Sequence, residues 1–291
     1  MDHPGVTVRS IRLSKGIPQK QIYTGIVAKS FAISFEQGRS MLNLHDFIQV
    51  LERVGVSWNE FDFIQRGYRN SEHTSLWRQF AEAANNRNSR TLDRLYREHR
   101  DDRADFGRVV AYLARAFQHE QTADSEAPCA PCSEAEKRFL TRYLLDKESW
   151  SLEETNLFTS FYYLFEEEAQ SELIRICYRS LLRYEEYPGY LERIYNLLTN
   201  YTSSCYEKGK RAEGDEWLQC IRELPHSKAY LHQMLNAKLC EALHHAAHGR
   251  VAEGSKLVEE VAGVYRTFAF RREEEDCRLH FEQIRIRYEV K

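Results

Sequence analysis

The sequence predicts an all-helical protein in which a compact bundle of short helices precedes a longer array of paired helices. Glycine and proline are scarce, with 13 and 6 in 291 residues, whereas all-β proteins need many turn residues. Apolar residues recur at i, i+3, i+4 and i+7, which is the spacing of one helix face. Breaks between these segments are short, and pairs of segments span roughly 35–40 residues, as helical-hairpin repeats do.

Five short helices are expected in the first 65 residues. The fourth is the clearest, because its apolar residues between Phe47 and Val54 share one helical face. Gly16 and Gly38 suit helix ends, where a left-handed residue often stops the helix. We expect helices at 6–14, 19–23, 29–37, around 47–54 and at 58–65, with Val8, Ile11, Phe61 and Ile64 facing the core.

The second and third of these segments are expected to form a helix-turn-helix, whose second helix enters the major groove of DNA. Ala32 and Phe35 lie three residues apart and would face the bundle. Phe31 is also assigned to the core, with contact to a thymine methyl group as the alternative. The residues left facing outward are Lys29, Ser30, Ile33 and Ser34.

Charge is unevenly distributed along the chain. Residues 1–40 hold six Lys or Arg against two Asp or Glu, and residues 71–291 hold 32 against 38, so the net charge of −3 conceals a basic head. A basic head is what contact with DNA phosphates requires. Within it, Arg12 and Glu36 would brace the motif as an ion pair; the alternative is two solvated surface charges.

Several motifs in this head resemble known regulators. Residues 8–20 (VRSIRLSKGIPQK) are similar to the opening of phage-repressor-type helix-turn-helix proteins, and residues 29–39 (KSFAISFEQGR) resemble their recognition segment. Together with residues 51–57 (LERVGVS) and Glu60-Phe61, they look like the Rgg/MutR family of Gram-positive transcriptional regulators. That family belongs to a wider group of regulators that sense peptides with tetratricopeptide-like domains.

The resemblance continues beyond the head in residues 139–145 (FLTRYLL) and 150–158 (WSLEETNLF). It implies a DNA-binding domain at 1–66, a linker at 67–72, and a tetratricopeptide-like superhelix at 73–291 for peptide sensing and dimerisation. The partners that it implies are double-stranded DNA, a short signalling peptide, a second copy of the chain and, as a further candidate, RNA polymerase.

The same resemblance assigns DNA contacts residue by residue. Positions that face the groove fall on Lys29, Ser30 and Ser34. Phosphate contacts fall on Gln19 and Arg39, and Lys20 completes the candidate set. Serine hydroxyls hydrogen-bond to base edges or phosphates, and lysine pairs with phosphate or guanine.

Eleven amphipathic segments are expected after Tyr68, each of a length typical of packed helices. The clearest repeat lies between Leu239 and Ala252, where small residues at helical spacing let two antiparallel helices approach closely. The expected spans are 72–85, 89–100, 105–120, 133–147, 152–166, 168–184, 189–206, 210–224, 227–247, 251–266 and 269–288.

A stack of such pairs leaves a concave face on which a peptide can bind through side-chain amides and apolar pockets. Asn196 and Asn200 are four residues apart, so their amides share one helix face. Each candidate has an alternative role as a surface residue or a hydrogen bond between helices. The candidate peptide-binding residues are Arg142, Tyr195, Asn196, Asn200, Tyr201 and Asn236.

Two motifs suggest metal or redox chemistry, and the sequence argues against both. Cys129 and Cys132 form a C-x-x-C in a loop over 123–131, with both thiols expected to be exposed, but no second ligand pair lies nearby. A redox-responsive disulfide and an incidental loop are the alternatives. His244 and His248 have a two-ligand spacing without the glutamate of H-E-x-x-H, so a surface helix end is preferred and no metal is expected.

The remaining patterns exclude several classes of protein. No apolar window reaches 18 residues and no secretory signal is evident, which predicts a cytoplasmic protein without membrane contact. No phosphate-binding loop, G-x-S-x-G or Cys–His pattern indicates an enzyme or a cofactor. Two alternatives to peptide control stay open: a scaffold that docks a partner protein, and a repressor that needs no ligand.

Overall fold

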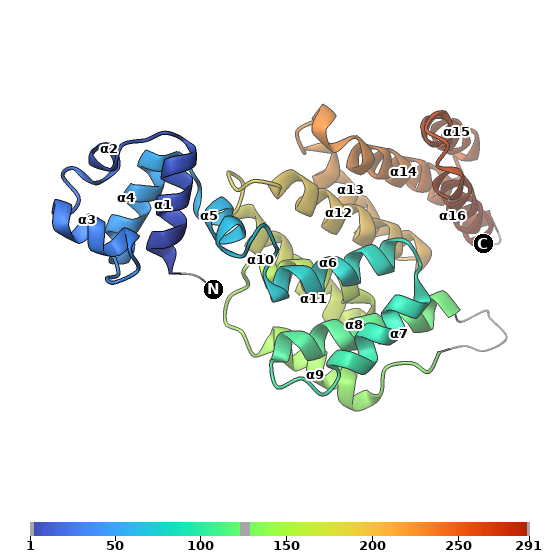
Figure 1. The fold of residues 1–291 in the computed structure, drawn as a ribbon. Coiled ribbons are helices and arrows are strands. Elements are labelled where there is room, and N and C mark those ends of the chain that lie inside the picture. Colours follow the sequence, from blue (N-terminus) through green and yellow to red (C-terminus); the bar gives the residue numbers. More distant parts are fainter. Residues whose placement is uncertain (1–2, 123–128, 290–291) are drawn as a thin grey trace. The chain divides into compact units, whose positions relative to one another are not determined.

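The computed structural model describes residues 3–122 and 129–289. Every helix or strand assigned to these residues is an α-helix or a short 3-10 helix, which confirms the all-helical fold class. The chain divides into two compact units, Met1–Ser133 and Glu134–Lys291, each of which is described on its own (Figure 1). Within the described residues, none of the helices combines the length and apolarity needed to cross a bilayer.

The first unit begins with the five expected short helices. Asn43 and Ser57 cap two of them by accepting backbone hydrogen bonds, and Gly55 ends one with a left-handed φ of 69°. A Cβ on Gly5 would lie 1.8 Å from the carbonyl oxygen of Phe35, so only glycine permits this close approach. The helices are α1 (Pro4–Ser14), α2 (Gln19–Tyr23), α3 (Lys29–Glu36), α4 (Leu44–Val54) and α5 (Trp58–Gln65).

These five helices enclose a core of their own. Phe35 is fully buried at its centre, with Phe47 and Phe61 in edge-to-face contact nearby. The residues assigned inward from periodicity, Val8, Ile11, Ala32 and Phe61, are all buried, and Ile64 packs against them. Three further helices complete the unit: α6 (Glu72–Asn85), α7 (Ser89–His99) and α8 (Asp105–Thr122).

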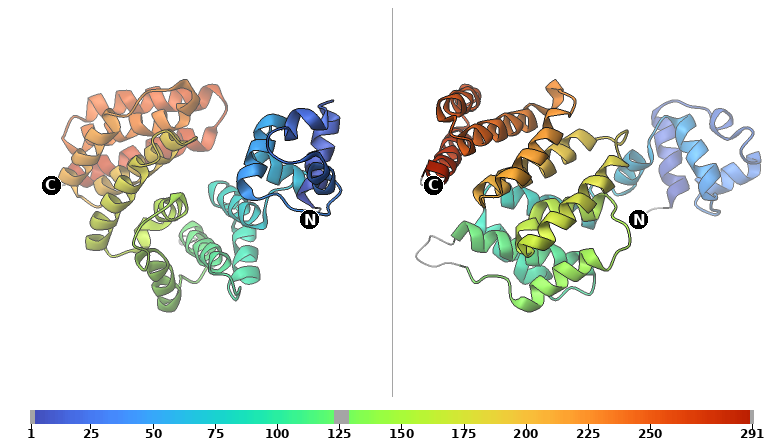
Figure 2. Two further views of the ribbon diagram at one scale, coloured as in Figure 1. Left: turned by 90° about the vertical axis from the view of Figure 1, so that its left-hand side faces the viewer. Right: turned by 180° about the vertical axis from the view of Figure 1, so that it is seen from behind.

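The second unit is an array of antiparallel pairs. α12 packs against α13, and α14 packs against α15, while α12, α14 and α16 contact one another in a row. The orange and red helices α14–α16 lie side by side in both views of Figure 2. The helices are α9 (Glu134–Leu145), α10 (Leu152–Phe161), α11 (Glu167–Leu182), α12 (Tyr190–Glu207), α13 (Arg211–Arg222), α14 (Leu231–Ala247), α15 (Val251–Thr267) and α16 (Arg271–Glu289), with 3-10 turns at Tyr162–Leu164 and Lys228–Tyr230.

The clearest repeat is the hairpin of α14 and α15. Ala242 and Ala246 are buried as expected, but Ala252 is exposed. The close contact is instead made by Gly254, where an added Cβ would lie 2.7 Å from the carbonyl oxygen of Ala242. The small residue that allows the helices to approach is therefore two positions further along than the repeat pattern predicted.

Two side-chain placements correct the sequence interpretation. Phe31 is 38% exposed, because the core stripe of α3 runs through Ala32 and Phe35 and Phe31 lies about 100° round the helix from Ala32. Cys132 is buried rather than exposed, and its thiol donates a hydrogen bond to the carbonyl of Tyr112, at 3.2 Å, on α8. Cys129 is partly buried, and residues 123–128 of the expected loop lie outside the described residues.

Candidate functional site

The outer face of α3 carries a mixed polar and apolar surface. Lys29, Ser30 and Ile33 are exposed, and Ser34 is partly exposed, so the four residues expected to face outward do so. Phe31 joins them, which places two large apolar side chains beside a lysine and two hydroxyl groups. Such a combination offers hydrogen bonds to base edges and apolar contact to thymine methyl groups.

A buried ion pair holds α3 in place. The guanidinium of Arg12 on α1 donates through Nε and Nη2 to both carboxylate oxygens of Glu36, each at 2.7 Å. Both residues are less than a tenth exposed, and the hydrogen bonds from Arg12 to Glu36 raise the pKa of Arg12. The expected brace is therefore present, and it is buried rather than a pair of solvated charges.

Gln19 joins this network from the first position of α2. Its amide nitrogen donates to the same carboxylate of Glu36 at 3.0 Å, while Arg12 also donates to the carbonyl of Ile17 at 2.9 Å. The carboxylate of Glu36 on α3 therefore connects this helix to both α1 and α2. An arginine–carboxylate pair joined by two parallel hydrogen bonds constrains the direction between its partners as well as their distance. The pair therefore fixes the orientation of α3 in addition to the apolar packing of the helix.

The candidate DNA-contacting residues lie around a shallow hollow between α2 and α3. A cavity of about 340 Å³ is lined by Gln19, Lys20 and Lys29, together with Tyr23, Thr24, Val27 and Ala32. Ser30 and Ser34 lie along α3 outside this lining, and Arg39 is exposed beyond the end of α3. The structure therefore gathers three of the six candidates at one hollow and leaves the others along the same segment.

The sequence analysis did not identify two basic residues whose hydrogen bonds connect the helices of the head. Arg53 on α4 donates to the carbonyls of Ile22 and Thr24, at 3.2 and 2.6 Å, at the end of α2. Lys15 donates to the carbonyls of Val54 and Gly55, at 3.0 and 2.9 Å, at the end of α4. Each partner lies about 30–40 residues away in sequence, so no local pattern could have indicated the contact.

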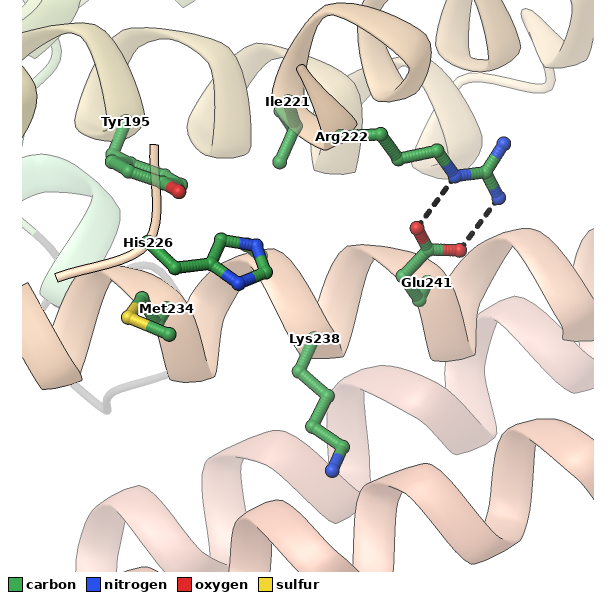
Figure 3. Close-up of a pocket in the computed structure, with 8 residues that line it drawn as sticks. Tyr195, Ile221, Arg222, His226, Met234, Lys238 and Glu241 are labelled. Atoms are coloured by element: carbon green, nitrogen blue, oxygen red, sulfur yellow. Dashed lines mark hydrogen bonds and ion pairs between the residues drawn. The ribbon is translucent and has the colours of Figure 1, made fainter. Parts of the chain in front are cut away.

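The second unit holds a separate cavity of about 350 Å³ between α12, α13 and α14. Tyr195 and Met234 lie at one end of it, and a two-point ion pair between Arg222 and Glu241, at 2.7 Å, lies at the other (Figure 3). His226 approaches from the segment that joins α13 to α14. The lining residues are Tyr195, Ile221, Arg222, His226, Met234, Ala237, Lys238 and Glu241.

The six candidate peptide-binding residues are not gathered in this cavity. Tyr195 alone lines it, and its hydroxyl donates to the carbonyl of Pro225 at 3.3 Å. Tyr201 is buried and its hydroxyl donates to Glu213 at 3.0 Å, so this group already has an internal partner. The others are spread over the unit: on α12, Asn196 is partly exposed and Asn200 is exposed, Asn236 on α14 lies 3.4 Å from His232, and Arg142 is exposed on α9.

Fold and site together define a class: a head of five short helices, in which a buried ion pair holds α3 with its polar face exposed, followed by helical hairpins. Comparison with protein families identifies it further. Residues 93–261, more than half of the chain, match the C-terminal domain of the HTH-type transcriptional regulator Rgg. The chain therefore belongs to the Rgg family of transcriptional regulators.

Solved structures share this fold over almost the whole chain. A candidate transcriptional regulator of Listeria monocytogenes EGD-e has a TM-score of 0.83 at 23% identity, covering 100% of this chain and 99% of the other. The SHP pheromone receptor Rgg2 of Streptococcus dysgalactiae has a TM-score of 0.77 at 15% identity, covering 96% and 99%. The PrgX/cCF10 complex has a TM-score of 0.67 at 13% identity, covering 97% and 99%.

Proposed function

We propose that this chain is a DNA-binding transcriptional regulator in which a short peptide, bound in the second unit, controls how α3 engages DNA. The observation that carries the proposal is the exposed face of α3 held by the buried Arg12–Glu36 pair, in a chain of the Rgg family. Peptide control is supported by relatives in fold: Rgg2 is a pheromone receptor, and PrgX was solved with cCF10.

At the DNA, the proposed roles follow side-chain chemistry. Lys29, Ser30 and Ser34 would read base edges, since they lie on the exposed face of the helix that enters the groove. Gln19, Lys20 and Arg39 would contact phosphates on either side. Phe31 would contact a thymine methyl group, the alternative that the sequence offered for it, and we add Ile33 because the structure exposes it as well.

For the peptide, we propose that the cavity between α12, α13 and α14 takes an apolar side chain. Ile221, Met234 and Ala237 supply apolar lining, and the ion pair of Arg222 with Glu241 leaves hydrogen-bonding capacity at the rim for the peptide backbone. The amides of Asn196 and Asn200 remain proposed backbone contacts, because both are at least partly exposed one turn apart.

We propose the residue ranges 1–66 and 73–291 as the DNA-binding and sensing domains, with a linker at 67–72. We place the end of the head at residue 66 because its core cluster, from Val8 to Phe61, contains no residue from a helix after α5.

A homodimer is proposed because two heads reading two half-sites give more base contacts than one. Leu279 and Ile286 on α16, 59% and 51% exposed, are candidates for the dimer contact. Because its ligand is DNA, we place the protein in the cytoplasm.

The experiment uses the full-length protein and DNA selected by it from a random duplex library. Lys29→Ala with Ser34→Ala should abolish the footprint on the selected DNA without changing the oligomeric state. Arg90→Ala, which removes an exposed positive charge from α7, is the matched control. An unchanged footprint for the α3 double variant would show that α3 is not the recognition helix.

A further inference from the structure

Three side chains of the kind that bind metal ions meet where α13 faces the end of α14. Asp215 comes from the second turn of α13, His244 from the last turn of α14, and His248 from the residue that caps α14. Nδ1 of His244 lies 2.7 Å from one carboxylate oxygen of Asp215, and Nε2 of His248 lies 3.0 Å from the other. One ligand atom from each residue lies within 4.8 Å of the others.

We propose that Asp215, His244 and His248 form a binding site for one divalent transition-metal ion of the Zn²⁺ type. Two imidazole nitrogens and one carboxylate oxygen are a ligand set that Zn²⁺, Co²⁺ and Ni²⁺ accept, with water completing the shell. In a tetrahedral Zn²⁺ site with bonds of about 2.0–2.1 Å, neighbouring ligand atoms lie roughly 3.3 Å apart. The observed N–O separations of 2.7 and 3.0 Å, which run to the two different oxygens of Asp215, are shorter than this by about 0.3–0.6 Å.

The surroundings give an ion access and room. A cavity of about 510 Å³ opens beside the cluster, lined by Asp215 and His248 with Gly209, Arg211, Ala212 and Tyr288. The three side chains are 34%, 13% and 25% exposed for Asp215, His244 and His248, so they are held by the fold and remain reachable. Water ligands would occupy the cavity side.

Two neighbours would act around the metal. The hydroxyl of Tyr206 donates to Asp215 at 2.9 Å, which would orient the carboxylate as a second layer of contacts. Arg250 donates to Nε2 of His244 at 2.8 Å, which makes Nδ1 the protonated nitrogen of that ring before an ion binds. Binding through Nδ1 would require the other tautomer, with the proton on Nε2, so Arg250, whose side chain is 43% exposed, would have to turn away from this nitrogen.

The sequence alone argued against this site because His244 and His248 offer only two ligands. Asp215 lies 29 residues before His244, on the preceding helix, and reaches the pair only when α13 packs against α14. An ion bound there would cross-link these two helices. The site is independent of the proposed peptide control, since none of its three ligands lines the cavity at Tyr195.

The test uses the full-length protein, stripped with a chelator and kept reduced, with CoCl₂ and ZnCl₂ as probes. We expect one ion per chain, a visible Co²⁺ spectrum without the intense near-ultraviolet bands of thiolate ligands, and a rise in Tm on adding Zn²⁺. Asp215→Asn and His244→Ala should each weaken Zn²⁺ binding by about tenfold or more. His245→Gln, the matched control on the same turn, should not.

Three outcomes would overturn the proposal. One is no binding by the parent protein at 100 μM Zn²⁺, and another is equal affinity in the parent and in both ligand variants. The third is a thiolate spectrum, which would place the ion on the cysteines. Circular dichroism without metal shows that the variants are folded, and His248→Gln provides a third variant should Asp215→Asn not fold.

Discussion

The Arg12–Glu36 pair is the most consequential single contact in the head, because both charges are removed from water. Taking two ions out of water is costly, and their attraction compensates only when the geometry is good and the remaining hydrogen bonds are satisfied. Here two hydrogen bonds join the pair. Gln19 donates a further hydrogen bond to Glu36, and Arg12 donates one to the carbonyl of Ile17. Removing one partner would leave the other charge buried and alone.

We therefore expect Glu36→Gln to lower the free energy of unfolding of the head by about 3–5 kcal/mol and to weaken DNA binding. The loss follows because Arg12 keeps its charge without a counter-ion. Urea unfolding followed by tryptophan fluorescence, with Trp58 next to the head core, measures it. Glu52→Gln, an exposed residue on α4, is the matched control; equal stability of the two variants would contradict the role of the pair.

Side chains on and beside α3 should separate into those that add affinity and those that add specificity. Arg39→Ala should weaken binding to all sequences and reduce the slope of log K against log salt by about 1, as expected for one lost phosphate contact. Ile33→Ala should leave that slope unchanged and relax the preference for thymine at one position. Titrations at several salt concentrations on matched DNA duplexes measure both, and identical slopes for parent and Arg39→Ala would rule out a phosphate contact at Arg39.

At the scale of an element, the start of α10 shows how a helix terminus is built. Ser151 and Glu154 form a capping box, in which the Glu154 carboxylate accepts from the backbone of Ser151 at 2.8 Å. Lys147 also donates to this carboxylate at 2.6 Å. Burial alone would raise the pKa of Glu154, but the hydrogen bonds from Lys147 and Ser151 outweigh it and lower the pKa to about 2.

This shift predicts a pH-dependent contribution to stability. A carboxyl whose pKa is lowered by folding stabilises the protein above its ordinary pKa near 4.5, and the contribution disappears as the pH falls toward about 2. Glu154→Ala should therefore lower stability by about 1–2 kcal/mol at pH 7, with a smaller difference from the parent at pH 3. Thermal melts across this range check it, with Glu148→Ala as an exposed control; a difference independent of pH would contradict the carboxylate's role.

At the scale of the whole molecule, control of DNA binding by a peptide requires that the peptide bind one state of the protein more tightly than another. Filling the cavity at α14 should remove this control without touching the head. Ala237→Trp places an indole in the space lined by Ile221 and Met234, and Asn196→Ala with Asn200→Ala removes the proposed backbone contacts.

We expect both variants to lose the response to peptide while keeping the parent's affinity for DNA. The probe is a library of synthetic apolar octapeptides, screened by fluorescence anisotropy and then added to footprinting reactions. Lys256→Ala, an exposed residue of α15, is the control. A full response in Ala237→Trp would mean that the peptide binds elsewhere, and loss of DNA affinity would mean that the variant disturbs the head.

Much of this architecture was predictable, because helices are encoded by local patterns. The second and fifth helices of the head begin and end at the predicted residues, because apolar spacing, capping residues and glycine stops are all patterns of residues close together in sequence. The burial of Phe35 and the exposure of Lys29 follow from the same periodicity. Phe31 was misplaced because a short helix offers too few turns to define its core stripe.

What the sequence by itself determined is the class of fold, the basic head, and the residues that one helix presents on one face. Only the tertiary structure decided which faces meet: that Glu36 serves Arg12 and Gln19 together, that Gly254 and not Ala252 allows the closest helix contact, and that Asp215 joins His244 and His248. The physical reason is how far apart in the sequence the interacting residues lie. Helix formation depends on residues three or four apart, whereas sites depend on side chains brought together across tens of residues by packing.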